Sequence, residues 1–160
     1  MQAPFKSLIC NAIDKDVGEF TQCRINLVGR NKKVANIHYL PKIIIDDFEA
    51  EGQFYQRTNG WHPFLYKIKF NPCEFMIKPY NFLAKLAYSY IRNYTNFNHT
   101  CPYPANEPIK LSNYDIEVNE FLRRFPVQNG LYMVQLTIVR KKKVILSING
   151  TIEVFDYRNS

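Results

Sequence analysis

The sequence has few glycines and lacks the short motifs that mark common enzymes. Its six glycines are scattered, so no Gly-rich loop is present to cradle a phosphate. The G-x-S-x-G nucleophile elbow is missing as well. His38, His62 and His99 stand apart and do not form the H-E-x-x-H spacing of a zinc hydrolase. We therefore expect no enzymatic activity, no cofactor and no metal site.

Long apolar runs are also absent. No run of about 18 apolar residues occurs, so the sequence predicts no transmembrane helix. Residues 1–10 lack the apolar core and the small-residue cleavage site of a secretory signal peptide. Either the chain is a mature or truncated form of a secreted protein, or it is cytosolic and its cysteines are free. The cysteine pattern favours the first explanation.

The charge is unbalanced towards basic residues, with a formal net charge of +7. A positive field favours anionic partners such as phosphates, acidic lipids and sulfated sugars. No zinc-finger spacing, RNP-like aromatic motif or basic helix is present, so we expect no nucleic-acid partner. The densest basic run, residues 140–143, lies between two alternating apolar segments and is expected to form a solvated hairpin turn.

The composition is that of a folded protein. The chain has 160 residues, of which 46% are hydrophobic and 15% aromatic, and no repeat or low-complexity tract interrupts it. This length suits one core. We therefore expect residues 1–160 to form a single β-sandwich domain.

Alternation of apolar and polar residues predicts roughly six to eight antiparallel strands. Asn59-Gly60 is expected to form a turn, and Asn129-Gly130 to open a strand. The predicted strands cover residues 21–28, 34–40, 43–55, 64–71, 114–118, 131–139 and 144–155. The last two form a hairpin around the basic run. This pattern predicts an all-β sandwich of two sheets with one inserted helix.

The inserted helix is predicted over residues 80–94, where apolar residues recur at helical spacing. Pro79 is expected at its start. Phe82, Leu86 and Tyr90 share the face that should point inward, while Lys85 and Arg92 should face solvent.

Two aromatic faces are candidates for a ligand site. They are ordinary core positions, or several of them line a cavity between the sheets. The candidates are Phe64, Tyr66 and Phe70 on a strand and Phe82, Leu86 and Tyr90 on the helix. The acidic residues Asp46, Asp47, Glu49 and Glu51 are interpreted as solvent-facing positions.

The four cysteines are separated by long intervals, with no C-x-x-C pair for zinc or redox chemistry. Their even number predicts two disulfides, and three pairings are open. We prefer Cys10 with Cys23 and Cys73 with Cys101, because the second bond would hold both ends of the helix to the sheet. Each closure is expected to contribute roughly 3 kcal/mol.

Three glycosylation sequons point to the same secretory route. They lie at Asn93 (N-Y-T), Asn98 (N-H-T) and Asn149 (N-G-T). Asn98 is the preferred site, because it is expected in a loop after the helix, where an acceptor remains exposed.

Several blocks resemble a known family. They are N-G-W-H-P-F-L-Y-K-I (residues 59–68), Cys73 with Phe75, and N-F-N-H-T-C-P-Y (residues 96–103). These blocks look like a large, insect-expanded family of small secreted proteins of uncharacterised function. That family is similar in turn to the ganglioside-activator and myeloid-differentiation-type (ML-like) lipid-recognition proteins. The resemblance runs from about Cys10 to Tyr157, and N-H-T-C-P is its most specific part.

The resemblance implies an immunoglobulin-like antiparallel sandwich whose sheets splay apart at one end to admit a lipid or other apolar ligand. Some relatives are implicated in chemosensation. The better-known lipid binders tie an early cysteine to one near the C-terminus, and no cysteine follows Cys101 here. Two functions follow as hypotheses. One is a secreted, non-enzymatic carrier of an apolar ligand, and the other is a secreted module with a packed core that recognises a cell-surface receptor or glycan through its basic surface.

Overall fold

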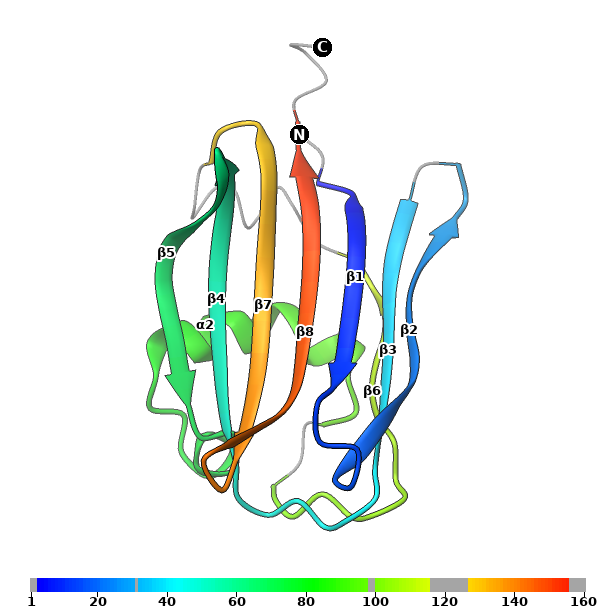
Figure 1. Cartoon of the computed structure of the whole chain (residues 1–160), viewed down its shortest axis with the longest axis vertical. Coiled ribbons are helices and arrows are strands. Elements are labelled where there is room, and N and C mark those ends of the chain that lie inside the picture. Colours follow the sequence, from blue (N-terminus) through cyan, green and yellow to red (C-terminus); the bar gives the residue numbers. More distant parts are fainter. Residues whose placement is uncertain (1–2, 31, 98–99, 116–126, 156–160) are drawn as a thin grey trace.

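Antiparallel strands dominate the computed structural model (Figure 1), which describes residues 3–30, 32–97, 100–115 and 127–155, without the side chains of Leu65 and Tyr66. The strands are β1 (Phe5–Ala12), β2 (Gly18–Val28), β3 (Lys32–Pro41), β4 (Glu49–Thr58), β5 (Gly60–Phe70), β6 (Ile109–Tyr114), β7 (Gly130–Arg140) and β8 (Lys143–Val154). The helical elements are α1 (Pro72–Ile77), α2 (Phe82–Ile91) and the 3-10 turn η1 (Arg92–Tyr94). The predicted all-β sandwich with an inserted helix is confirmed.

The strands form two sheets. The large sheet has the order β1-β8-β7-β4-β5, and the small sheet has the order β2-β3-β6. A disulfide between Cys10 on β1 and Cys23 on β2 ties an edge of one sheet to an edge of the other. A second disulfide joins Cys73 of α1 to Cys101. This pairing is the one preferred from the sequence, and it leaves no free cysteine.

The turns predicted at residues 140–143 and at Asn59-Gly60 are present in the structure. Lys141 and Lys142 connect β7 to β8 and have φ angles of 51° and 64°. Two successive positive φ angles are typical of the two-residue hairpin turn whose twist matches that of its strands. The lysines are exposed, so the predicted solvated basic turn is confirmed. Gly60, with a φ of 97°, starts β5 directly after Asn59.

Some element boundaries differ from those predicted. The apolar run Ile43 to Ile45 precedes β4 and is not part of it, because Ile45 exchanges backbone hydrogen bonds with Tyr103, at 3.0 and 2.8 Å, in the loop after Cys101. The strand predicted at residues 114–118 is β6 at Ile109–Tyr114 instead. Residues 116–118 lie outside the described part of the chain.

The short helix α1 was not predicted, because six residues are too few to show a helical period. Its start nevertheless carries a recognisable signal. The Asn71 side chain accepts hydrogen bonds from the backbone N–H groups of Cys73 and Glu74, and Pro72 follows at the first helical position. The helix buries Phe75, whose ring contacts Phe70 at a centroid distance of 5.4 Å.

Helix α2 begins later than predicted and turns a different face to the sheet. Asn81, and not Pro79, precedes its first turn and accepts a hydrogen bond from the Ala84 N–H. Ala84 is the residue buried most deeply, whereas Phe82 is 74% exposed. The inward orientation predicted for Phe82 is therefore wrong, because the face of α2 that packs on Phe75 is the one with Ala84 and Tyr88. Lys85 and Arg92 are exposed, as predicted.

Tyr39 of β3 is buried at the end of the sandwich near the β7–β8 turn. Its ring packs edge-on against Phe20, and its hydroxyl has no hydrogen-bond partner among the described residues. Gly18 lies so close that an added Cβ would sit 2.5 Å from the Tyr39 ring and 2.8 Å from the Leu40 carbonyl oxygen. The absence of a side chain at this position is therefore a packing requirement.

We predict that Gly18→Ala lowers the free energy of unfolding by at least about 2 kcal/mol, because a backbone carbonyl cannot move aside cheaply. Gly52→Ala in β4 is the matched control, since a Cβ there meets nothing within 4 Å. We expect the control to change stability by less than about 0.5 kcal/mol. Urea unfolding of both variants provides the measurement, and equal losses would contradict the packing account.

Burial of two tyrosine hydroxyls makes the free energy of unfolding depend on pH in the alkaline range. It raises the pKa of Tyr39 and of Tyr103 from 10.0 to about 12, with smaller contributions from Asp14 and Tyr88 respectively. The folded state thus keeps these protons longer than the unfolded state. Their stabilising contribution is complete below pH 10 and is lost as the pH rises to about 12.

We predict a loss of about 1 kcal/mol per tyrosine at pH 11 relative to pH 8. Tyr39→Phe should remove its share of this loss, and at pH 8 it should be at least as stable as the wild type, because it deletes an unpaired hydroxyl. Urea titrations at the two pH values test this. An unchanged pH dependence in Tyr39→Phe would contradict it.

Candidate ligand-binding site

The two faces of the large sheet differ in chemistry. The outer face carries charged pairs, including Lys67–Glu51 at 3.4 Å, Lys69–Glu49 at 3.6 Å and Lys6–Glu153 at 3.0 Å. Glu49 and Glu51 are thus paired with lysines on the outer face of the sheet. Asp47 precedes β4 and accepts a hydrogen bond from the Asn71 side chain.

The histidines do not form a site in the described part of the chain. The His62 Nε2 lies 3.2 Å from the Asn59 carbonyl oxygen. Burial, and then the neighbouring Lys110 charge, lower the pKa of His38. His99 lies outside the described residues. Within those residues no group of His, Cys, Asp or Glu is arranged to hold a metal ion.

The inner face of the large sheet is apolar and faces α2 and the small sheet. Among the described residues, three clusters of buried side chains form the core, with members from both sheets, the helices and the loops. The main cluster consists of Val17, Tyr39, Ile45, Tyr103, Ile145 and Leu146. The helix cluster consists of Ile68, Phe75 and Ala84, and the end cluster consists of Tyr132 and Val154. A domain of this size usually has one contiguous core. Here the core is divided, so the part of the inner face between the clusters is a candidate ligand-binding surface.

Val134 lies in this space. It belongs to β7, the central strand of the large sheet, and pairs with Phe54 of β4 and Gly150 of β8. Because side chains alternate along a strand, it shares the inner face with the buried Tyr132. Val134 is nevertheless 42% exposed, whereas Tyr132 is 7% exposed.

Two glycines widen the gap around Val134. A Cβ added at Gly52 would meet no atom within 4 Å, and one at Gly150 would meet only Leu8, at 3.7 Å. We call this region the open patch. Its residues are Leu8, Gly52, Phe54, Val134, Leu136 and Gly150.

The open patch contains no charged residue, and the polar groups at its edge are neutral. The Tyr132 hydroxyl donates to the Gln128 carbonyl oxygen at 2.6 Å and accepts from the Gln56 side chain at 3.4 Å. Burial raises the pKa of Tyr132, and the Gln56 hydrogen bond offsets this in part. The hydroxyl therefore stays protonated at neutral pH. Such a surface suits an apolar chain and offers no counter-ion to a charged group.

Of the ligand-site residues predicted from the sequence, Phe64 lies next to the open patch, because it pairs with Phe54 across β4 and β5. Phe64 packs against Tyr132 at a centroid distance of 5.5 Å, and Phe70 packs against Phe75. Leu86 and Tyr90 are half-buried on α2. Phe82 faces solvent, as described above, and the side chain of Tyr66 lies outside the described residues.

The residues of the open patch were not predicted. The sequence did contain one signal for this site, because a glycine interrupts each of two strands: Gly52 lies in β4 and Gly150 in β8. Glycine within a strand often marks a place that another molecule or segment approaches closely. The exposure of Val134 has no counterpart in the sequence, because it depends on what lies above it.

A depression with a volume of about 440 Å³ lies beside the β7–β8 turn, away from the open patch. It is lined by Ile13, Asp14, Lys15, Asp16, Lys143 and Val144. Its lysines and aspartates are equal in number, so it provides little net charge for an anionic ligand.

Two of the three sequon asparagines lie in the described part of the chain. Asn93 is exposed in η1. Asn149 lies on the outer face of β8, opposite Gln135, and its buried amide oxygen has no hydrogen-bond partner in the part of the chain that the structure describes. Asn98, the preferred site, lies outside the described residues.

The match to a known family covers most of β4, all of β5, the helices, β6 and the start of β7. A model of the family described as "Protein of unknown function (DUF1091)" matches residues 50–134. The chain belongs to this family. The family segment begins in β4 and ends at Val134, so it contains Gly52, Phe54 and the Cys73–Cys101 disulfide. Leu8 and Gly150 lie outside it. No curated protein matches the chain.

We predict that Val134→Thr lowers the free energy of unfolding by less than about 0.5 kcal/mol, because the added hydroxyl stays in contact with water. Val154→Thr is the matched variant, since Val154 is 3% exposed on β8. Burying an unpaired hydroxyl there should cost about 1–3 kcal/mol. Urea unfolding of the ligand-free protein compares the two. Equal losses would mean that the open patch is covered.

Proposed function

We propose that the protein is a secreted, non-enzymatic carrier of a lipid or another apolar ligand. The ligand lies against the open patch. The observation that carries the proposal is the 42% exposure of Val134 on the inner face of the central strand. Apolar surface in contact with water costs about 25 cal/mol per Å². A ligand with an apolar chain would cover this surface and recover that free energy.

The shape of the region supports the same ligand class. The main, helix and end clusters border the open patch, so a bound chain would contact packed side chains around it. The glycines at positions 52 and 150 leave room above the sheet. Ligand sites of this kind are mostly apolar, with a few polar groups at one end. The Tyr132 hydroxyl would provide such a group.

The resemblance to ML-like lipid-recognition proteins agrees with this proposal at the level of the fold. Fold alone does not determine function, so the resemblance adds support only because the open patch is apolar. A chemosensory role, in which the ligand is a signal molecule, belongs to the same proposal.

Secretion is supported by covalent chemistry. Both pairs of cysteines form disulfides, which persist in oxidising compartments and are rare in the cytosol. The exposed Asn93 provides an accessible glycosylation sequon, and we keep Asn98 as the preferred one. In the described part of the chain, no helix is long and apolar enough to cross a bilayer.

Filling the open patch tests the proposal. We predict that Gly52→Phe weakens the uptake of a fluorescent fatty acid at least about tenfold, because the new ring occupies the space that the ligand needs. Gln53→Phe is the matched control, since it adds a ring of the same size on the opposite face of β4. We expect this control to bind as the wild type does. Probe titration measures affinity, and native mass spectrometry detects lipid that copurifies.

Two results would overturn the proposal. The first is a correctly oxidised wild-type protein that takes up no probe and carries no lipid. The second is a folded Gly52→Phe variant that binds as tightly as the wild type. Either result would favour the rival function, recognition of a receptor or glycan through the basic surface.

A further inference from the structure

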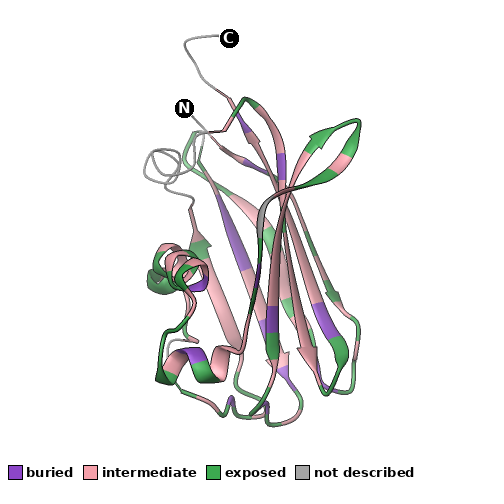
Figure 2. Ribbon diagram, turned by 90° about the vertical axis from the view of Figure 1, so that its left-hand side faces the viewer, coloured by how far each residue is buried: buried purple, intermediate pink, exposed green. Residues whose placement is uncertain are grey.

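The tip of the β2–β3 hairpin exposes two apolar side chains. Leu27 is 66% exposed and Val28 is 48% exposed, and they are the last two residues of β2. Both are paired in register, Leu27 with Lys33 and Val28 with Lys32. The hairpin tip extends away from the large sheet (Figure 1), and most of it is exposed (Figure 2). These side chains are therefore held in place by paired strands while they face water.

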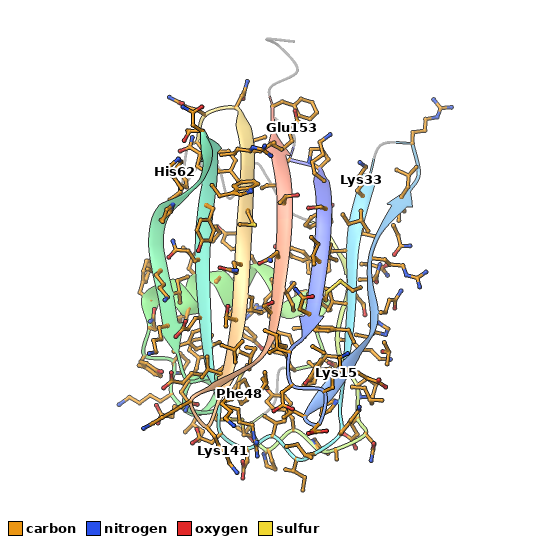
Figure 3. All side chains as sticks on the ribbon, in the orientation of Figure 1. Lys15, Lys33, Phe48, His62, Lys141 and Glu153 are labelled. Atoms are coloured by element: carbon orange, nitrogen blue, oxygen red, sulfur yellow. A yellow bond between two sulfur atoms is a disulfide. The ribbon has the colours of Figure 1, made fainter. Side chains whose placement is uncertain are left out.

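The charges around this tip are almost all of one sign. No Asp or Glu occurs between Glu19 and Asp46 in the sequence. The basic residues of the hairpin are Arg24, Arg30, Lys32 and Lys33. Lys32 is paired with Asp115 at 3.3 Å, and Arg24 and Arg30 are exposed. Lys33 lies at the start of β3, close to the tip (Figure 3).

We propose that the β2–β3 tip docks the protein on a membrane surface that carries anionic lipid headgroups. Leu27 and Val28 enter the boundary between headgroups and acyl chains, and Arg30 and Lys33 contact the headgroups. Membrane binding of this kind grows with the buried apolar area and with attraction to anionic lipid. A soluble anion or a sulfated glycan would be recognised by charge alone, and it would leave Leu27 and Val28 in water.

Another exposed apolar segment lacks this combination. Ile77, the last residue of α1, is 77% exposed, and Phe82, the first residue of α2, is 74% exposed. Lys78 and Lys85 are exposed nearby, but the exposed Glu74 lies one helical turn before Lys78, and its carbonyl oxygen accepts the Lys78 N–H. The segment carries charges of both signs, so it favours an anionic surface less than the hairpin tip does. It provides a matched control, because it has at least as much exposed apolar surface as the hairpin tip.

The membrane docking goes beyond the carrier function and does not depend on it. The tip uses side chains that are separate from the open patch, so each can fail without the other. Together they would place a carrier of apolar ligands on the surface that contains such ligands.

Flotation with lipid vesicles tests the docking. The vesicles contain phosphatidylcholine alone or phosphatidylcholine with about a third phosphatidylserine. We expect the wild type to bind the anionic vesicles and to bind neutral ones much more weakly. Leu27→Ser/Val28→Ser should reduce the partition coefficient at least about tenfold. Arg30→Gln and Lys33→Gln should each reduce it about fivefold, and salt should weaken binding.

The controls separate docking from folding and from ligand uptake. Ile77→Ser/Phe82→Ser should bind anionic vesicles within about twofold of the wild type. The Leu27→Ser/Val28→Ser variant should melt as the wild type does and take up the fluorescent fatty acid in solution with unchanged affinity, whereas Gly52→Phe should still float with the vesicles.

Four results would overturn the docking proposal. They are a wild type that does not bind anionic vesicles, equal binding to neutral vesicles, unchanged binding by Leu27→Ser/Val28→Ser, and loss of binding in Ile77→Ser/Phe82→Ser instead. None of these bears on uptake of the fatty-acid probe in solution, so a failed docking proposal and a failed carrier proposal are distinguishable.

Discussion

The inner face of the large sheet has to be shielded from water, and the small sheet and α2 share that task. The Cys10–Cys23 disulfide ties β1 to β2 and brings the small sheet against one part of the face. The Cys73–Cys101 disulfide ties α1 to the loop that pairs with Ile45, and α1 in turn supports α2 over β4 and β5. The cover comes from two sides, and Val134 lies where neither side reaches completely.

Local patterns in the sequence were sufficient for most of the strands and turns. The alternation from residue 131 to residue 155 defines β7 and β8, and the lysine pair between them has no role in the core. The disulfides followed from a preference among three pairings, supported by the position of the helix. These features depend on neighbours in the chain or on simple alternation, which a single sequence displays.

Features that depend on distant contacts were predicted poorly. Residues 43–45 have the composition of a strand, yet they do not belong to β4. Ile45 forms an isolated β-bridge with Tyr103 instead. Phe82 has the spacing of an inward-facing residue, but α2 packs on Phe75 through the face with Ala84 and Tyr88. The candidate site shows the same limit, because the sequence pointed to Phe64 beside it but not to the glycines or to Val134. Exposure is a property of the packed molecule, and an amino-acid pattern does not contain it.

The distribution of basic residues also affects how copies of the chain meet one another. Strands β2 and β5 are edge strands, and unpaired backbone groups at an edge can recruit a second chain into the sheet. Lys67 and Lys69 on β5 and Arg24 on β2 would be brought close to their own counterparts by such pairing. Like charges placed opposite each other destabilise paired strands. The same residues that make the protein basic therefore oppose its aggregation, although Leu27 and Phe82 face water.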